Sequence, residues 1–279
     1  MEMTFAYFNG RFIDGQEPVI PIEERGHQFG DGVYEVIRFY NKKPFMMKEH
    51  LERLYGGAKA IKLTIGSEPE ELEKAMLELV ESSGLKNADL YMQATRGVAP
   101  RQHLFPQCSA SISMTVKPSQ PISEELRQQG VKVLLLEDER WKNCYIKSLN
   151  LLPNVLAKQE AYEQNCFESV LVRDGFITEG SSSNFFIVKE GSVQTAPLTN
   201  YILPGITRIA VKAIAEELAI PFIERAFTEA ELVEADEAFL TSTLCEVLPV
   251  TVVNHRKVGD GKPGLITETL LAHLQDRTK

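Results

Sequence analysis

The feature of this 279-residue chain that most constrains its fold is a change of hydrophobic period near residue 48. Before it, short apolar stretches separated by turn residues predict a β meander, with strands at Thr4–Phe8, Val33–Tyr40 and Phe45–Met47. After it, apolar residues recur at steps of three and four, as on one face of a helix: Leu51, Leu54, Ala58 and Ile61. A sheet covered by helices is therefore expected.

The same pattern continues to residue 116, with a helix predicted at Pro69–Ser83 and strands at Leu90–Arg96 and Ala110–Val116. The segment Lys117–Pro121 then carries two prolines and interrupts regular structure. We predict a first domain of residues 1–117, a linker of residues 118–123 and a second domain of residues 124–279.

Strands and helices interleave less regularly in the second domain, and we expect the α+β fold class. Strands are expected at Val131–Glu137, Ser169–Val172 and Asn184–Val188, and helices from about Leu149 to Asn165 and from Gly205 onward. In the first of these helices, three residues are expected to face a core: Leu152, Val155 and Leu156.

Charge and composition narrow the partners. The formal net charge is −9, which disfavours nucleic acid and anionic membranes, although local cations in a cleft still allow a small anionic ligand. The start of the chain has no basic segment followed by an apolar run, and no stretch approaches the roughly 18 apolar residues of a membrane helix. The four cysteines include no C-x-x-C pair, so we expect reduced thiols, no metal site and a cytoplasmic location.

Lys147 is the first candidate for chemistry. It follows an apolar strand and precedes a helix, in Tyr145–Asn150. A lysine that loses hydration at such an edge titrates lower, as a Schiff-base nucleophile requires. The ordinary alternative is a solvated surface lysine.

The segment Thr178–Asn184 places an acid, a glycine and three serines between two predicted strands. An ordinary serine-rich loop is one interpretation. The other is that Glu179 points at a ligand while Ser181, Ser182 and Asn184 satisfy polar groups around it. A carboxylate beside a pyridine nitrogen would keep that nitrogen protonated.

Two further segments combine hydroxyls with a backbone suited to phosphate. Gly205–Arg208 opens a helix, where free N–H groups and the helix dipole favour an anion, and Thr241–Thr243 ends an apolar strand. A plain N-cap is the alternative for the first. Both together favour a phosphate site.

The loop Arg96–Pro106 is dense in cations and stiffened by Pro100 and Pro106. Surface arginine is the default interpretation. Arg101 and His103 in a rigid loop would also hold a carboxylate in a fixed pose, because guanidinium binds it through a planar fork.

In their order along nearly the whole chain, these segments resemble the fold type IV pyridoxal-phosphate enzymes, and within them the bacterial D-amino acid aminotransferases. The matching motifs are Gly30–Glu35, Glu49–Leu54, Arg101-x-His103-x-Phe-Pro106, Ile146–Asn150, Thr178–Asn184, Gly205–Arg208 and Thr241–Thr243. The resemblance implies an N-terminal α/β sandwich, a C-terminal α/β pseudo-barrel, pyridoxal 5′-phosphate as cofactor and a homodimer. It also implies D-amino acids and 2-oxo acids as substrates.

The resemblance also implies residue roles. Lys147 would form the Schiff base with the cofactor and then shuttle the substrate proton, and Glu179 would keep the pyridine nitrogen protonated. Leu203 would pack against the ring. The phosphate would be bound by Arg53, Ile206, Thr207, Ser242 and Thr243. The substrate carboxylate would be bound by Tyr34, Arg101 and His103.

Three alternatives stay open. A branched-chain L-aminotransferase would not need Arg101-x-His103, and an aminodeoxychorismate lyase would share the Lys147 and Glu179 segments but act on a larger substrate. The third is a non-enzymatic ligand-binding protein that keeps only the fold.

Overall fold

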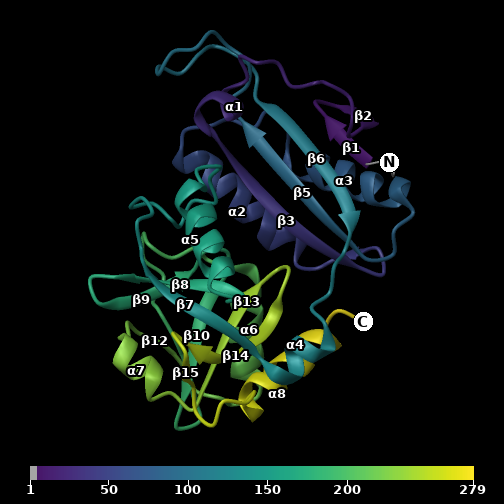
Figure 1. The fold of residues 1–279 in the computed structure, drawn as a ribbon. Coiled ribbons are helices and arrows are strands. Elements are labelled where there is room, and N and C mark those ends of the chain that lie inside the picture. Colours follow the sequence, from purple (N-terminus) through teal and green to yellow (C-terminus); the bar gives the residue numbers. More distant parts are fainter. Residues whose placement is uncertain (1–4) are drawn as a thin grey trace. The chain divides into compact units, whose positions relative to one another are not determined.

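A computed structural model describes residues 5–279, which form two compact units (Figure 1). The first unit comprises the described residues up to Gln120 together with Ile146–Asn150. The second comprises Pro121–Tyr145 and Leu151–Lys279. The chain leaves the first unit within the predicted linker, and the short segment that carries Lys147 belongs to the first unit although it lies far beyond that linker.

The first unit is an antiparallel sheet with two long helices on one face (Figure 1). The strand order is β2-β1-β6-β5-β3-β4. The strands are β1 Phe5–Phe8, β2 Arg11–Asp14, β3 Gly32–Tyr40, β4 Lys43–Pro44, β5 Ala88–Thr95 and β6 Ser111–Pro118. The helices are α1 Arg25–Phe29, α2 Met47–Ala60 and α3 Pro69–Ser83.

The helix α3 confirms the sequence prediction at both ends. Pro69 occupies its first turn, where the missing N–H does no harm, and Gly84 ends it in the left-handed region at φ 70°. The buried residues of this helix share one face, namely Leu72, Met76, Leu79 and Val80. Together with the inward residues of β3, β5, β6 and α2, these side chains form one core.

Two expectations for the N-terminal strands are wrong, and two elements were missed. The sheet is no simple meander, because β1 pairs with β2 and β6 and not with β3. No strand covers Phe45–Met47: Met46 turns through a positive φ of 54°, and Met47 already begins α2. The elements β2 and α1 were not predicted. Thr4 of the predicted strand Thr4–Phe8 lies outside the described residues.

The second unit is a curved mixed sheet with helices packed on it (Figure 1). The strand path is β12-β11-β10-β13-β14-β7-β8-β9, with β15 paired to β14. The strands are β7 Val131–Glu137, β8 Glu168–Arg173, β9 Phe176–Gly180, β10 Asn184–Lys189, β11 Ser192–Thr195, β12 Phe222–Glu224, β13 Glu237–Ser242, β14 Glu246–Val253 and β15 Arg256–Lys257. The helices are α4 Glu124–Gln129, α5 Leu152–Glu163, α6 Ile206–Glu217, α7 Glu229–Val233 and α8 Leu265–Asp276.

The helix α5 corrects one prediction. Leu152, Val155 and Leu156 were expected to face a core, but their side chains are 68%, 58% and 58% exposed. The helix instead packs through the side that carries Ala161, which is fully buried. Periodicity shows which residues share a helix face, but not whether another element covers that face.

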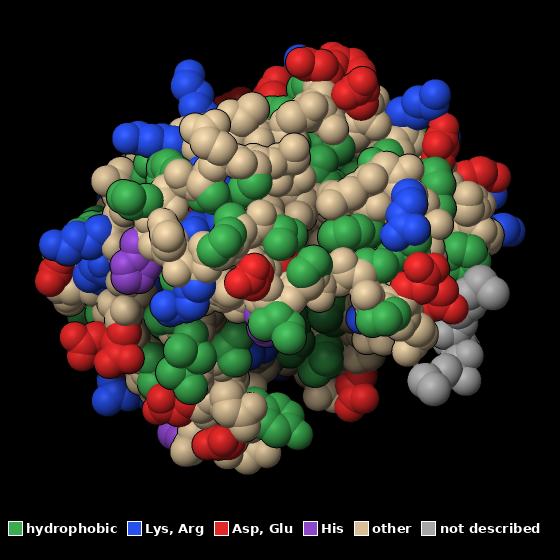
Figure 2. All heavy atoms as spheres, turned by 90° about the horizontal axis from the view of Figure 1, so that it is seen from above, with side chains coloured by type: hydrophobic (Ala, Val, Ile, Leu, Met, Phe, Trp, Pro, Cys, Tyr) green, Lys and Arg blue, Asp and Glu red, His purple; other side chains and the backbone are tan. Residues whose placement is uncertain are grey.

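The surface seen from above carries interspersed acidic and basic side chains (Figure 2). This mixture gives that face no field of a single sign. Among residues 5–279, no helix has both the length and the hydropathy to span a bilayer.

Candidate active site

Lys147 is held in the first unit by backbone pairing with β3. The N–H of Tyr34 donates to the Lys147 carbonyl at 3.0 Å, and the N–H of Leu149 donates to the Gly32 carbonyl at 3.1 Å. On either side of Lys147, Ile146 and Ser148 are buried. The backbone of the lysine is therefore fixed on both sides, while its own side chain is half-buried.

The amine of Lys147 lies over an aromatic ring. Its Nζ is 4.2 Å from the ring centroid of Tyr34, which stacks on Tyr91 at 5.8 Å. Such a contact attracts the ammonium electrostatically and restricts where the side chain can lie. Tyr34 and Lys147, two predicted site residues far apart in the sequence, are thus in contact.

A buried ion pair lies on the same strand, one residue after Tyr34. Arg53 donates from Nε and Nη2 to the two carboxylate oxygens of Glu35, each at 2.7 Å. The Nδ1 of His50 lies 2.7 Å from Glu35 Oε2. The fork of Arg53, which the resemblance assigns to the phosphate, is therefore oriented by a carboxylate from β3.

The charge states of this cluster follow from its burial. Burial raises the pKa of Glu35, but the charge and hydrogen bonds of Arg53, together with those of His50, outweigh it and lower the pKa to about 2. Burial lowers the pKa of His50, and the nearby Arg53 and Lys147 lower it further against the opposing effect of Glu35. Glu35 is therefore ionised and His50 neutral at neutral pH.

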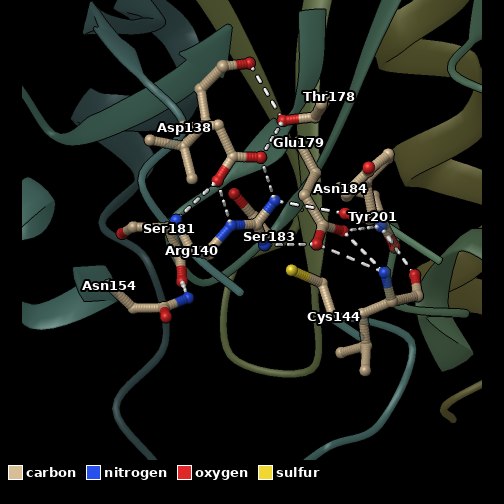
Figure 3. Close-up of polar contacts among 12 residues, drawn as sticks. Asp138, Arg140, Cys144, Asn154, Thr178, Glu179, Ser181, Ser183, Asn184 and Tyr201 are labelled. Atoms are coloured by element: carbon tan, nitrogen blue, oxygen red, sulfur yellow. Dashed lines mark hydrogen bonds and ion pairs between the residues drawn. The ribbon is translucent and has the colours of Figure 1, made fainter. Parts of the chain in front are cut away.

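In the second unit, Glu179 lies near the end of β9 and is almost fully buried (Figure 3). Its Oε1 accepts from Arg140 Nη1 at 2.6 Å, and its Oε2 accepts from Asn184 Nδ2 at 2.8 Å. The backbone N–H of Leu203 also donates to it, at 3.1 Å. Glu179 is thus on a strand and not in a loop, and three of the predicted site residues, Glu179, Asn184 and Leu203, are in direct contact.

Arg140 is itself held by a second acid. Its Nε and Nη2 donate to the two oxygens of Asp138 at 2.8 and 2.9 Å (Figure 3). Arg173 also pairs with Asp138, and Thr178 donates to it at 3.1 Å. The guanidinium of Arg140 is therefore fixed in the plane that lets its remaining nitrogen reach Glu179.

These contacts decide the ionisation of Glu179. Burial raises its pKa from 4.5 to about 6, although the charge and hydrogen bond of Arg140 and the Leu203 N–H oppose this increase. Burial also raises the pKa of Asp138, but Arg140 and Arg173 outweigh it and the net change is downward. At neutral pH, Glu179 is an ionised carboxylate in an enclosed site.

The serine segment after Glu179 is tied to a buried acid that the sequence did not indicate. Ser181 and Ser182 donate their hydroxyls to the two oxygens of Glu168, at 2.5 and 2.6 Å. Lys158 compensates this acid at 3.5 Å. The hydroxyl hydrogens of both serines are thus directed at Glu168, and the cofactor role of these serines stays a prediction.

The residues predicted to bind phosphate lie at the start of α6 and the end of β13. Gly205 is the N-cap of α6, and a Cβ there would lie 2.0 Å from Asn184 Oδ1, so only glycine fits. Ile206 and Thr207 form the first turn. Thr241 pairs with Asn184 across the strands, and its buried Oγ1 has no hydrogen-bond partner among the described residues.

The two hydroxyl residues that follow Thr241 differ in what they contact. Ser242 accepts from the N–H of Cys245 at 3.1 Å and so shapes the turn after β13. Thr243 lies in that turn and is half-buried. The α6 N-terminus and the end of β13 therefore both lie next to Asn184. Thr241 is its neighbour across the strands, and Gly205 approaches its side chain directly.

Arg101 and His103 lie in the exposed connection between β5 and β6. The guanidinium carbon of Arg101 is 4.8 Å from the ring centroid of Phe29, and the ring of His103 is 5.7 Å from it. The two residues are thus brought to one aromatic ring of the first unit. Their predicted role in binding a carboxylate stays a prediction.

Sequence reasoning missed the residues that set the charges: Glu35, His50, Asp138, Arg140 and Glu168. Two signals were present. Asp138 and Arg140 lie within three residues of the end of β7, and Glu35 occurs between apolar residues of β3, a strand that also carries Arg38. A charged residue in such a position is buried only when it is paired, so a partner had to exist elsewhere in the chain.

Comparison with known proteins shows the family and the fold of this chain. The family described as amino-transferase class IV matches residues 32–253. The D-alanine aminotransferase of Bacillus licheniformis is 44% identical over 274 residues, which cover 96% of this chain and 95% of that protein.

Solved structures of branched-chain amino acid aminotransferases share the fold. The Escherichia coli enzyme gives a TM-score of 0.92 at 26% identity, covering 99% of this chain and 94% of that one. A second such enzyme, solved with pyridoxamine 5′-phosphate, also gives 0.92, at 27% identity, covering 100% of this chain and 95% of that one. The predicted α+β, fold type IV class is confirmed. The chain therefore belongs to the class IV amino-transferases.

Proposed function

We propose that this aminotransferase moves amino groups between D-amino acids, of which D-alanine is the representative, and 2-oxo acids such as 2-oxoglutarate and pyruvate. The observation that carries the choice of D-amino acids is the 44% identity, over nearly the whole chain, to a D-alanine aminotransferase. The branched-chain enzymes share the fold at 26% to 27% identity. Fold alone does not decide between the two substrates.

The residues present fit pyridoxal 5′-phosphate, the cofactor of this family. Such a group needs an amine for its aldehyde, an acid for its ring nitrogen and donors for its phosphate. Lys147 offers the amine, and Glu179 offers a carboxylate that Arg140 keeps ionised. The α6 N-terminus and the unpartnered Thr241 Oγ1 offer phosphate donors.

When bound, the cofactor draws electrons from the substrate Cα through its protonated ring and so makes the Cα proton acidic. Lys147 would take the proton from the substrate Cα at Nζ and deliver it to the carbon of the cofactor that carried the aldehyde oxygen, acting as general base and then as general acid. Its contact with Tyr34 limits the positions that Nζ reaches. Efficient proton transfer needs that restriction.

Glu179 acts on the ring nitrogen without moving a proton during the reaction. Its negative charge favours the protonated form of a pyridine nitrogen, and Asn184 and Leu203 hold both carboxylate oxygens in place. The positive charge of Arg140 is shared between Asp138 and Glu179, so it neutralises only part of the charge of Glu179. The carboxylate of Glu179 therefore keeps enough basicity to accept a hydrogen bond.

Arg53, Ile206, Thr207, Ser242 and Thr243 bind the phosphate in this proposal. Glu35 fixes the guanidinium of Arg53, and the first-turn N–H groups of α6 point outward from the helix end. Ser181 and Ser182 support the site through their segment, which Glu168 anchors. Leu203 would pack against the ring of the cofactor.

For the substrate carboxylate we propose Tyr34, Arg101 and His103. A carboxylate bound on one side of a fixed cofactor decides which Cα substituent faces Lys147, and hence which enantiomer reacts. We further propose that the protein is cytoplasmic and forms a homodimer. Sedimentation of the purified protein tests the homodimer.

The experiment mixes purified protein with 2-oxoglutarate and, in separate reactions, with D-alanine or L-leucine, and it follows glutamate as the common product together with pyruvate from D-alanine. We expect pyruvate from D-alanine and no turnover of L-leucine. Turnover of L-leucine alone would assign the protein to the branched-chain group instead.

A second experiment tests the lysine. Borohydride reduction followed by peptide mapping should find the cofactor attached to Lys147, and Lys147→Ala should lose both the attachment and the visible absorbance. Attachment to another lysine would refute the assignment. The ligand-binding alternative predicts bound cofactor with no turnover of either donor.

A further inference from the structure

The part of the loop that carries Arg101 and His103 contains no helix or strand, and near its start Val98 pairs with Glu24 in an isolated bridge. The loop runs from Gly97 to Ala110 between β5 and β6, and Arg101, Leu104 and Phe105 are exposed. An exposed loop of this kind is ordinarily mobile. A loop that fixes the pose of a substrate carboxylate must be ordered, because small errors of placement cost much of the rate.

A buried guanidinium reaches the loop between the two proposed ligands. Arg25, in α1, is 3% exposed, and its Nη1 donates to the carbonyl of Gln102 at 2.5 Å. Its Nε donates to Asp31 Oδ2 at 2.9 Å. Gln102 lies directly between Arg101 and His103, so Arg25 holds the backbone at the point from which both side chains diverge.

A second buried guanidinium reaches the loop further along. Arg96 donates from Nε to the same Asp31 oxygen at 2.9 Å, and from its other nitrogens to the carbonyls of Lys62 and Ile61 at 2.8 Å. Its guanidinium carbon lies 3.7 Å from the ring centroid of Phe105. Arg96 and Phe105 thus form a cation–π contact, and the ion pair between Arg96 and Asp31 fixes the guanidinium in that contact.

Phe29 completes the arrangement. The guanidinium carbons of Arg25 and Arg101 each lie 4.8 Å from its ring centroid, and His103 lies 5.7 Å from it. The ring thus contacts the buried anchor as well as both proposed ligands.

We infer that Asp31, Arg25 and Arg96 form a buried anchor that positions the Arg101–His103 loop, with Arg25 as the positioning residue. The role of the loop in binding substrate rests on the proposed function; its anchoring does not. An ion pair that stabilised only the core would not require Arg25 Nη1 to donate to the carbonyl of Gln102, which is an exposed loop residue. Asp31 gives both arginines one fixed counter-ion, so the two contacts with the loop are set by a single carboxylate.

The first test is Arg25→Lys in the full-length protein with bound cofactor. An ammonium is a point charge and lacks the planar fork that serves Asp31 and Gln102 together. We expect trypsin to cut after Arg101 about tenfold faster and KM for D-alanine to rise about tenfold, with kcat changed by less than about threefold. Cofactor absorbance should stay the same.

The matched control is Arg38→Lys. Arg38 is another buried arginine of the first unit that binds an aspartate through two hydrogen bonds, at 2.7 and 2.9 Å to Asp89, on the far part of β3. The Arg38→Lys variant should lower the melting temperature as Arg25→Lys does. It should leave the rate of trypsin cleavage after Arg101 and the KM at their wild-type values. A purely structural role for Arg25 predicts that the two variants behave alike.

The second test is Phe105→Ala, which removes a ring that is 57% exposed and so does not threaten folding. It should speed the cut after Arg101 and raise KM by a few-fold in each case. Leu104→Ala is its control, because Leu104 is the neighbouring residue and is 80% exposed.

The outcomes separate the anchor from the function. Unchanged cutting in both Arg25→Lys and Phe105→Ala overturns the anchor. Faster cutting with unchanged KM supports the anchor and refutes the carboxylate role of the loop. If the wild-type protein uses L-leucine and not D-alanine, the proposed function fails, while the cutting rates still decide the anchor.

Discussion

Replacing Arg140 by methionine should turn Glu179 from an ionised into a protonated acid at neutral pH. Methionine fills similar space but brings no charge. In the wild-type protein, the pKa of Glu179 is already raised to about 6 by burial, and Arg140 is the strongest influence that opposes the burial. Without Arg140, the hydrogen bonds from Asn184 and Leu203 remain, but neither carries a charge.

The size of the effect follows from the geometry. The 2.6 Å contact between Arg140 Nη1 and Glu179 Oε1 places the two charge centres about 4 Å apart, where unit charges attract by about 4 kcal/mol at an effective dielectric constant of about 20. This energy corresponds to about 3 pKa units. The pKa of Glu179 should therefore rise well above 7 in Arg140→Met.

Stability should change with a definite sign. Because the folded pKa of Glu179 lies above 4.5, its ionisation in the folded state costs stability as pH rises, by about 2 kcal/mol above pH 6 in the wild-type protein. In Arg140→Met the loss of stability continues to higher pH and exceeds the wild-type loss by about 3–5 kcal/mol. The contribution of Glu179 should differ least between the two proteins below about pH 5, where this side chain is protonated in both.

Infrared difference spectroscopy gives the direct assay. The cofactor-free Arg140→Met protein should show a protonated carboxyl band at about pH 8 that disappears when Glu179→Gln is added. Arg140→Lys is the matched control, because it keeps a cation. If the Arg140→Met spectrum at that pH shows only ionised carboxylates, burial and hydrogen bonding alone set the charge of Glu179 and the reasoning is refuted.

Two further predictions concern the groups around the site. Glu35→Gln should lose about 3 kcal/mol of unfolding free energy at neutral pH, because the pKa of Glu35 is lowered to about 2. In the wild-type protein this stability is present above pH 4.5 and is lost as pH falls toward 2. Urea denaturation of Glu35→Gln should therefore lack that pH dependence. Gly205→Ala should displace Asn184, whose Oδ1 would lie 2.0 Å from the new Cβ, and weaken cofactor binding by at least about tenfold in a titration. Gly56→Ala, with no atom near the new Cβ, is its control and should change stability by less than about 1 kcal/mol.

Local signals predicted local structure well. Pro69 and Gly84 mark both ends of α3, and Gly205 marks the start of α6, because helix ends impose their own residue preferences. The same reasoning failed at Phe45–Met47, where an apolar run suited a strand, but Met46 adopts a positive φ that starts a helix. Propensity gives no warning of a single residue in the left-handed region.

The order of the strands was beyond local signals. β1 pairs with β6 across more than a hundred residues, and β7 lies between β8 and β14. Every apolar strand suits several neighbours, so the pairing depends on how the whole sheet buries its faces. For the same reason, the exposed side of α5 could not be predicted from its spacing.

The residues that set charge were missed for a physical reason that is the same in both units. Arg53 neutralises Glu35 from a helix 18 positions away, and Arg140 neutralises Glu179 from 39 positions away. A motif identifies the group that would touch a ligand, because its type and its local backbone are specific. The protonation of that group is fixed by a charge brought to it by tertiary folding. Lys147, Glu179 and Arg53 could therefore be proposed from the sequence, whereas Glu35 and Arg140, which set the charges of the site, became visible only from the buried pairs that they form.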